Sequence, residues 1–221
     1  MAMQQHADLT SLNTFGIAAK ADRLARFDTV DGLRELLSTP AVSQAPVLIL
    51  GGGSNVLFTQ DFRGTVLLNE LPGIAVVQED ADQVWGGLEN LSLIPGKVGA
   101  APMQNIGAYG VEIKDTFSSL EALRIADGAL VTFDKEACGF GYRESYFKRA
   151  GKDRFVILSV TFRLNKDPVL NTSYGNIQQE LDRMGITAPT IGNGSNAVIA
   201  IRRSKLPDPA VVGNAGSFFK N

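Results

Sequence analysis

A run of three glycines, Gly51-Gly52-Gly53, is followed by Ser54 and Asn55 and comes directly after an apolar stretch. Consecutive glycines let backbone N–H groups converge on one concavity, which suits phosphate oxygens, and the two polar side chains can add donors. The pattern is neither a Walker loop, which continues with Gly-Lys-Ser/Thr, nor the Rossmann fingerprint, which opens a helix. The spacing alone leaves two interpretations open, a phosphate site and a plain tight turn.

A second stretch, residues 94–110, contains little side-chain bulk because glycines and alanines recur through it. Such a backbone can lie against a flat or charged ligand at contact distance. Gln104, Asn105 and Tyr109 could supply hydrogen bonds to a heterocycle. The alternative is structural, with two glycine-rich loops closing a small barrel.

Two basic segments could meet anions. Arg143 lies in a glycine-flanked segment between Tyr142 and Glu144, where its guanidinium could face a bound carboxylate or simply pair with Glu144. Arg202 and Lys205 belong to a basic helix end that prolines terminate. This segment suits a diphosphate or, as the more common outcome, a solvated helix face.

Ser217 lies in the segment 213–221, with small residues before it and two phenylalanines after it. The only histidine, His6, lies in the polar N-terminal leader, so a nucleophilic serine, a Ser-His-Asp hydrolase and a histidine-rich metal site are all disfavoured. A serine that protonates a strongly basic carbanion is still feasible. We therefore expect no metal site and expect a cofactor to carry the difficult chemistry.

The composition excludes several other classes. The chain has 221 residues, a net charge of −2 and ordinary globular proportions of apolar and charged residues. The charge gives no general attraction to nucleic acid or to an anionic membrane, and no apolar run approaches the length of a membrane span. Cys138 is the only cysteine, so no disulfide framework is expected. The polar start predicts a cytoplasmic protein without a signal peptide.

The elements that must position these residues form an α+β pattern with two lobes. Residues 1–69 predict a small βαβ lobe, and residues 70–205 a larger, mostly antiparallel lobe. A short helix is predicted at 31–40, with Asp31 as its cap and Pro40 as its stop. Strands are predicted at 21–30, 45–50, 56–58, 65–69, 73–77, 117–126, 130–134 and 154–164. Further helices are predicted at 176–185 and 193–205.

Six segments in this order resemble the signatures of the UDP-N-acetylenolpyruvoylglucosamine reductase family. They are LNTFGI, LILGGGSNVLF, GLENLSLIPGKVGAAPMQNIGAYGVE, FGYRESYF, RRSKLPDP and GNAGSFFKN. The resemblance implies a vanillyl-alcohol-oxidase/PCMH-type FAD-binding fold. It also implies that NADPH reduces FAD, which passes hydride to an enolpyruvyl ether and yields UDP-N-acetylmuramate for peptidoglycan. Cell-wall biogenesis, cell shape and cell division are the implied processes.

The resemblance also assigns roles to residues. Arg143 would stabilise the enolate and Ser217 would protonate the adjacent carbon. The implied contacts of UDP-N-acetylglucosamine enolpyruvate are Tyr142, Tyr174, Arg202, Lys205 and Asn221. The implied FAD contacts are Gly51, Gly52, Gly53, Ser54, Asn55, Gly99, Ala100, Ala101, Pro102, Gln104, Asn105, Gly107, Ala108, Tyr109 and Gly110.

The chain departs from the family pattern in two places. The family has a further strand and a helix where Trp85 meets Gly86 here, so we expect residues to be missing at that point. Residues 206–221 would begin a substrate-binding domain whose remainder, with a glutamate that assists protonation, is absent. A monomer is expected. Two rival hypotheses are another FAD oxidoreductase of the same fold and a non-catalytic flavin- or nucleotide-binding module.

Overall fold

A computed structural model describes residues 2–76 and 85–215. The N-terminal lobe contains a four-stranded sheet in the order β1-β2-β4-β3. The strands β2, β4 and β3 are parallel, and β1 pairs antiparallel with β2. The elements are β1 (Gln4–Asp8), η1 (Thr10–Leu12), β2 (Lys20–Phe27), α1 (Val30–Ser38), α2 (Pro40–Ser43), β3 (Val47–Leu50) and β4 (Phe62–Asn69).

This lobe confirms the expected βαβ opening but differs from the sequence prediction in three places. The polar leader contributes β1, because Ala7 is fully buried against β2 while its neighbours face solvent. Residues 56–58, which lie within the described part, form no strand. The cap of α1 is Thr29, whose hydroxyl accepts a hydrogen bond from the Gly32 N–H, and Asp31 lies in the first turn.

The second lobe is built on a three-stranded antiparallel sheet in the order β8-β7-β9. The strands predicted at 117–126 and 154–164 are present, but the strict alternation expected for 154–164 is not, because Val156, Ile157 and Leu158 are consecutive apolar residues. The described residues 73–76 are not in a strand, in contrast to the prediction for 73–77. The elements are β7 (Phe117–Arg124), β8 (Leu130–Asp134), α3 (Lys135–Cys138), η5 (Tyr146–Lys148) and β9 (Phe155–Phe162).

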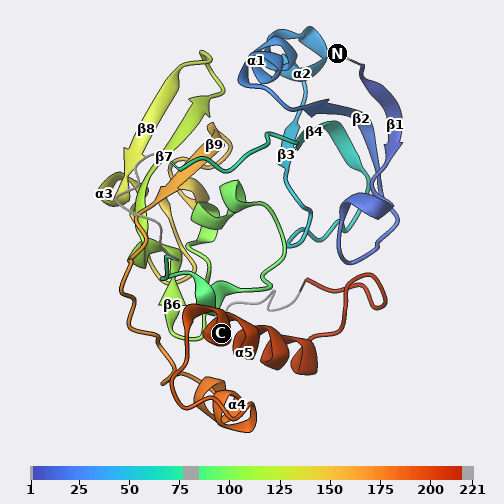
Figure 1. Cartoon of the computed structure of the whole chain (residues 1–221). Coiled ribbons are helices and arrows are strands. Elements are labelled where there is room, and N and C mark those ends of the chain that lie inside the picture. Colours follow the sequence, from blue (N-terminus) through green and yellow to red (C-terminus); the bar gives the residue numbers. More distant parts are fainter. Residues whose placement is uncertain (1, 77–84, 216–221) are drawn as a thin grey trace.

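Short elements and two helices complete the chain. The helices α4 and α5 pack on each other at the end of the molecule opposite α1 (Figure 1). Thr190 caps α5 through a reciprocal pair of hydrogen bonds with Asn193. The elements are η2 (Glu89–Leu91), η3 (Val98–Gln104), β5 (Gly107–Ala108), β6 (Val111–Glu112), η4 (Ile113–Asp115), α4 (Ile177–Arg183) and α5 (Ile191–Lys205).

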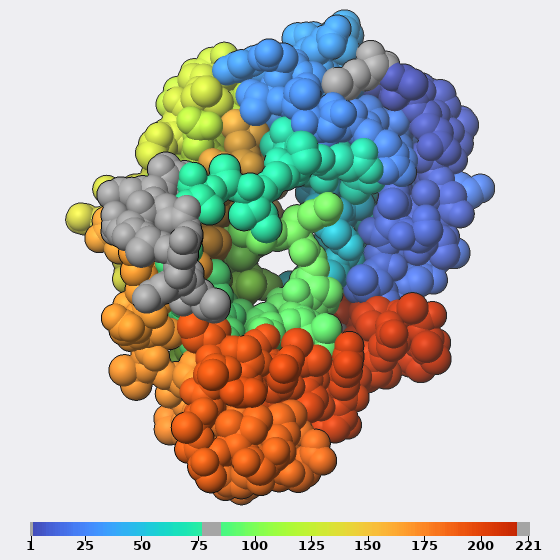
Figure 2. Space-filling view, viewed as in Figure 1, coloured from blue at the N-terminus to red at the C-terminus, as the bar shows by residue number. Residues whose placement is uncertain are grey.

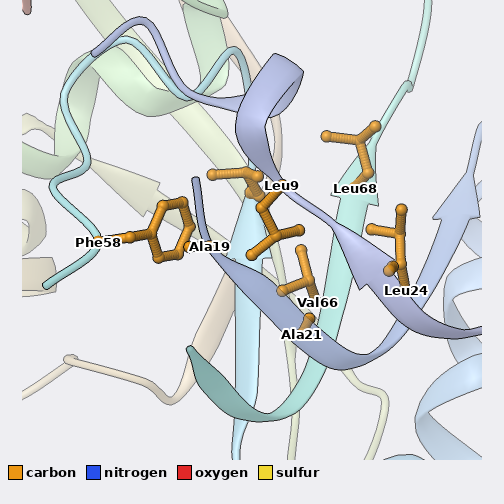
Figure 3. Packing of buried hydrophobic residues seen from close by; sticks show 9 residues of the cluster. Leu9, Ala19, Ala21, Leu24, Phe58, Val66 and Leu68 are labelled. Atoms are coloured by element: carbon orange, nitrogen blue, oxygen red, sulfur yellow. The ribbon is translucent and has the colours of Figure 1, made fainter. Parts of the chain in front are cut away.

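The hydrophobic core has several clusters. Figure 3 shows one of them, in which Leu9, Phe58 and Val66 pack on one face of the N-terminal sheet. On the other side of the sheet, α1 packs through Leu33 and Leu36 in a second cluster that also includes Val156 of β9. Burial of each such side chain stabilises the fold by about 1.5–3 kcal/mol. The second cluster therefore joins the two sheets at the α1 end of the molecule.

Across the described ranges, we find no helix whose length and apolarity would allow it to cross a membrane.

Candidate functional site

The two glycine-rich stretches predicted to bind a ligand lie against each other. A Cβ placed on Gly52 would lie 3.0 Å from the Cα of Gly96, and one placed on Gly51 would lie 3.5 Å from the Lys97 side chain. Ser54 reinforces this contact, since its hydroxyl donates to the Pro95 carbonyl at 3.2 Å. The packing distance depends on glycine, because any larger residue at position 52 would push the two backbones apart.

A third segment, LNTFGI (residues 12–17), packs against the triple-glycine loop formed by residues 51–53. Gly53 has a φ of +60°, and a Cβ there would lie 1.9 Å from the Leu12 carbonyl oxygen. The Thr14 N–H donates to the Gly53 carbonyl at 3.1 Å. Asn13 is buried and holds this segment in shape, because its Nδ2 donates to the carbonyls of Leu9 and Ile17. This loop can therefore accommodate only glycine at position 53 without moving.

A cavity of about 2680 Å³ lies between the two lobes. Figure 2 shows the hollow between the N-terminal lobe and the rest of the molecule. Three of the residues predicted to contact FAD, Gly51, Gly99 and Ala100, line the cavity, together with parts of β3 and β9. The cavity exceeds the roughly 300–1,000 Å³ of a typical small-molecule pocket. It has room for a dinucleotide.

The other predicted FAD contacts of the second stretch are not among the residues of the described chain that line the cavity. Asn55 Nδ2 donates to Gln104 Oε1 at 3.3 Å, which joins the two stretches again. Asn105 is fully buried, and both polar atoms of its amide are used by the protein backbone. A hydrogen bond from this buried side chain to a heterocycle stays a prediction. Gly107, Ala108, Tyr109 and Gly110 form the β5–β6 hairpin and its turn, while Ala101 and Pro102 are buried in η3.

Arg143 is carried by a tight turn that contacts the glycine-rich stretch. Gly141 and Glu144 exchange two backbone hydrogen bonds across this turn, at 3.0 and 3.2 Å. The Arg143 guanidinium carbon lies 5.8 Å from the centre of the Tyr142 ring, within cation–π range. Glu144 forms its ion pair with Arg149 at 3.3 Å, so the alternative of an Arg143–Glu144 pair is wrong. Arg143 is not among the described residues that line the cavity.

Two predicted substrate contacts, Tyr174 and Arg202, lie beside the β5–β6 turn, which is formed by the predicted FAD contacts Tyr109 and Gly110. A Cβ on Gly110 would lie 3.2 Å from Tyr174 Cβ, and Tyr109 contacts Gly175 from the same side. Burial lowers the pKa of the Arg202 guanidinium, and neighbouring Tyr109 partly opposes this shift. Arg202 Nε is buried without an acceptor among the described residues, so a donor is available here. Lys205 lies at the exposed end of α5.

Ser217 and Asn221 lie outside the described residues. The segment that precedes them is placed, however. Asn214 N–H donates to the Thr14 carbonyl at 2.8 Å, and a Cβ on Gly213 would lie 2.1 Å from the Phe15 carbonyl oxygen. This part of the chain therefore lies on the LNTFGI segment, whose residue Thr14 also contacts Gly53.

Lys97 is a candidate that the sequence reasoning did not select. It lines the large cavity and also a small neighbouring cavity of about 220 Å³ beside Gly51 and Gly52. A lysine at this place provides positive charge next to backbone suited to phosphate. The available signal was that Lys97 is the only cationic residue in the stretch 94–110. Thr14 is a second candidate that the sequence did not indicate. Its buried hydroxyl has no hydrogen-bond partner among the described residues.

Comparisons with known proteins agree with this geometry. Residues 75–134 match the family described as FAD binding domain. The chain is 51% identical over 237 residues to a UDP-N-acetylenolpyruvoylglucosamine reductase of Burkholderia lata, covering 96% of this chain and 68% of that protein. The corresponding protein of Pseudomonas aeruginosa is 48% identical over 242 residues, covering 100% of this chain and 71% of the relative.

A solved structure has a similar fold. The crystal structure of UDP-N-acetylenolpyruvylglucosamine reductase from Thermus caldophilus superposes with a TM-score of 0.66 at 24% sequence identity, covering 100% of this chain and 74% of that one. The alignment with the Pseudomonas aeruginosa protein spans 242 positions and includes 100% of this chain, which has only 221 residues. The relative therefore contains internal residues that this chain lacks.

Proposed function

The chain belongs to the UDP-N-acetylenolpyruvoylglucosamine reductase family, and we propose that it reduces the enolpyruvyl ether of UDP-N-acetylglucosamine in the cavity between its lobes. Membership of this family makes the protein an FAD-containing oxidoreductase of peptidoglycan synthesis with NADPH as co-substrate. The fold is the PCMH-type FAD-binding fold that the sequence predicted.

The observation that carries the proposal is the contact between the two glycine-rich stretches. They are far apart in the sequence, and they meet at one wall of a cavity large enough for a dinucleotide. The cavity beside this contact favours a ligand site over two loops that only close the fold. The cradle of Gly51, Gly52 and Gly96, with Lys97 beside it, fits a diphosphate that needs close backbone approach and positive charge.

FAD, when bound, supplies the redox chemistry by which hydride from NADPH reaches the substrate. The residues of this chain hold and orient it. We assign the diphosphate to residues 51–55 with Lys97, and the ring system to the stretch 97–110 with Gly99 and Ala100 at the cavity surface. The side chains of this part of η3 at the cavity are small at Gly99 and Ala100 and larger at Val98 and Met103.

Arg143 and Ser217 are the proposed catalytic residues. Hydride addition to the terminal carbon of the enolpyruvyl group leaves negative charge next to a carboxylate. A guanidinium stabilises that charge through charge-assisted hydrogen bonds, and we assign this role to Arg143. The Ser217 hydroxyl would then donate a proton to the adjacent carbon. Its neighbours Gly213 and Asn214 are fixed on the LNTFGI segment, which supports this assignment.

The nucleotide-sugar is assigned to the other side of the glycine-rich stretch. Tyr174 and Arg202 converge beside Tyr109, and the unpartnered Arg202 Nε suits an anionic ligand. Lys205 at the end of α5 adds charge on the same helix. Tyr142 is exposed beside Arg143, and Asn221 is assigned by family resemblance alone.

The remaining organisation is also a proposal. We place the FAD-binding lobes at residues 1–69 and 70–205 and the start of a substrate-binding domain at 206–221. The internal residues that relatives possess are assigned to the junction between Trp85 and Gly86. A cytoplasmic monomer is the proposed state, and no nucleic acid or membrane partner is assigned.

The function is tested with purified protein loaded with FAD. We expect NADPH oxidation that depends on the enolpyruvyl substrate, and a loss of roughly 10²–10³-fold in Arg143→Ala, as for removal of one oxyanion-stabilising donor. Arg149→Ala is the matched control, because Arg149 lies nearby but is exposed and pairs with Glu144. Stoichiometric FAD binding without any substrate-dependent turnover would favour a non-catalytic flavin-binding module. That alternative has support from the internal residues that this chain lacks.

A further inference from the structure

The turn that carries Arg143 is attached to the glycine-rich stretch by two fully buried polar side chains. Asn105 and Ser145 are both 0% exposed. Asn105 Nδ2 donates to the Gly141 carbonyl at 3.0 Å, and Ser145 Oγ donates to the Met103 carbonyl at 2.7 Å. The two hydrogen bonds run in opposite directions between the segments, so each segment holds the other.

Both anchors are themselves held in place. Asn105 Oδ1 accepts from the Lys114 N–H at 3.2 Å, and Ser145 Oγ accepts from the Phe147 N–H at 3.2 Å. Asn105 also has a φ of +44°, a left-handed conformation that asparagine tolerates better than most residues. Loss of either side-chain donor would leave a buried carbonyl unsatisfied, which is costly.

The backbone between the two anchors is strained at Arg143. Its φ is +52°, in the left-handed region that a long side chain adopts only when its surroundings impose it. The Arg143 carbonyl also accepts a hydrogen bond from Lys148 Nζ at 3.1 Å. The anchors on Gly141 and Ser145 lie on either side of Arg143 in the chain. They therefore hold the backbone from which the Arg143 side chain projects.

We infer that Asn105 and Ser145 are positioning residues that fix the direction of the Arg143 side chain relative to the glycine-rich wall. This inference rests on the proposed function, in which Arg143 contacts the substrate. Misplacement of a catalytic group by about 1 Å can cost roughly 10²-fold in rate. Loss of either side chain should therefore slow the substrate step, and loss of Ser145, which lies outside the stretch assigned to FAD, should leave the NADPH step unchanged.

The test uses the FAD-loaded protein and two variants. Asn105→Asp keeps the size and the acceptor for the Lys114 N–H but places a carboxyl oxygen opposite the Gly141 carbonyl. Ser145→Ala removes the hydrogen bond to Met103. The matched control is Thr65→Val in β4, because Thr65 is equally buried and its hydroxyl donates to the Ala41 carbonyl at 3.1 Å. Thr65 lies in the four-stranded sheet of the N-terminal lobe, outside the turn that carries Arg143.

Two readouts separate positioning from general destabilisation. The first is hydrogen–deuterium exchange of the peptide that covers 139–145. The second compares the single-turnover rate of the NADPH-reduced enzyme with substrate and the rate of reduction by NADPH. For Asn105→Asp and Ser145→Ala we expect faster exchange and a substrate step slowed roughly tenfold or more. Ser145 lies outside the stretch assigned to FAD, so in Ser145→Ala the NADPH step should stay within about twofold of wild type. Thr65→Val should leave exchange in 139–145 and both rates unchanged.

Three other outcomes would contradict the inference or the proposed function. A normal substrate step despite faster exchange in 139–145 would overturn the inference. Failure of both variants to fold with FAD would also overturn it, because the side chains would then serve the fold as a whole. If Arg143→Ala itself leaves the substrate step unchanged, the proposed role of Arg143 fails instead.

Discussion

Substitution of Gly53 by alanine is the perturbation whose effect the structure defines most closely. Gly53 has a φ of +60°, and a Cβ there would lie 1.9 Å from the Leu12 carbonyl oxygen. Gly128, in the turn between β7 and β8, provides a matched control, because its φ is +69° and a Cβ there would meet nothing within 4 Å. Both substitutions incur the same left-handed backbone strain, so their difference isolates the steric contact.

The expected magnitudes follow from these contacts. The backbone strain costs about 1–2 kcal/mol at either position. At Gly53 the LNTFGI segment must also move. The hydrogen bond from the Thr14 N–H, at 3.1 Å, is then lost, which costs roughly 0.5–1.5 kcal/mol. Disturbance of the buried Asn13 contacts adds roughly 1–3 kcal/mol. We therefore expect Gly53→Ala to lower the free energy of unfolding by roughly 1.5–4.5 kcal/mol more than Gly128→Ala.

Urea unfolding of the two variants and the wild type measures this difference. Fluorescence titration with FAD on the same samples should show weaker binding for Gly53→Ala and unchanged binding for Gly128→Ala. Equal losses of stability in the two variants would refute the reasoning. The LNTFGI segment would then yield to the added methyl group at no cost and would not support the triple-glycine loop.

Three further predictions concern charge, a buried amide and a buried thiol. Lys97→Gln should raise the Kd for FAD roughly tenfold or more, and this effect should shrink at high salt. Lys152→Gln on the surface should leave the Kd unchanged. Equal FAD titration curves for the two variants would contradict this prediction. Asn13→Ala should lower the free energy of unfolding by roughly 1–3 kcal/mol in urea, and an unchanged midpoint would contradict it. Burial raises the pKa of the Cys138 thiol from 9.0 to about 12. Only the unfolded chain loses this proton from about pH 9 upward, so stability should fall between pH 9 and about 12, and less so in Cys138→Ala. Identical pH profiles of the two proteins would contradict this assignment.

Much of the fold was predictable because its long elements carry apolar runs that are bounded by turn residues. The strands β7 and β9 lie within the runs predicted for them, although neither alternates strictly between apolar and polar residues, and α4 ends close to Gly185 as expected. The parallel βαβ opening followed from β2, α1 and β3 in order. These elements bury one face in the core, so local sequence and tertiary packing favour the same structure.

The sequence predictions failed or were incomplete where tertiary contacts determine the local structure or the partner of a side chain. The polar sequence of β1 becomes a strand because β2 offers it a partner and Ala7 fills the core. In the site, the glycine spacing predicted backbone that approaches a ligand but could not show that the buried Asn105 side chain bonds to the backbone at Gly141 and Lys114. The partner of Glu144 was equally hidden, because Arg149 reaches it only after the chain turns through η5.

The central claim is that the two glycine-rich stretches together form the FAD cradle. Calorimetric titration of FAD into the wild type and into Gly52→Val tests it most directly, because a Cβ at Gly52 would already lie 3.0 Å from the Cα of Gly96. We predict one FAD per chain for the wild type and loss of most of the affinity in a variant that remains folded. Unchanged affinity in folded Gly52→Val would contradict the claim.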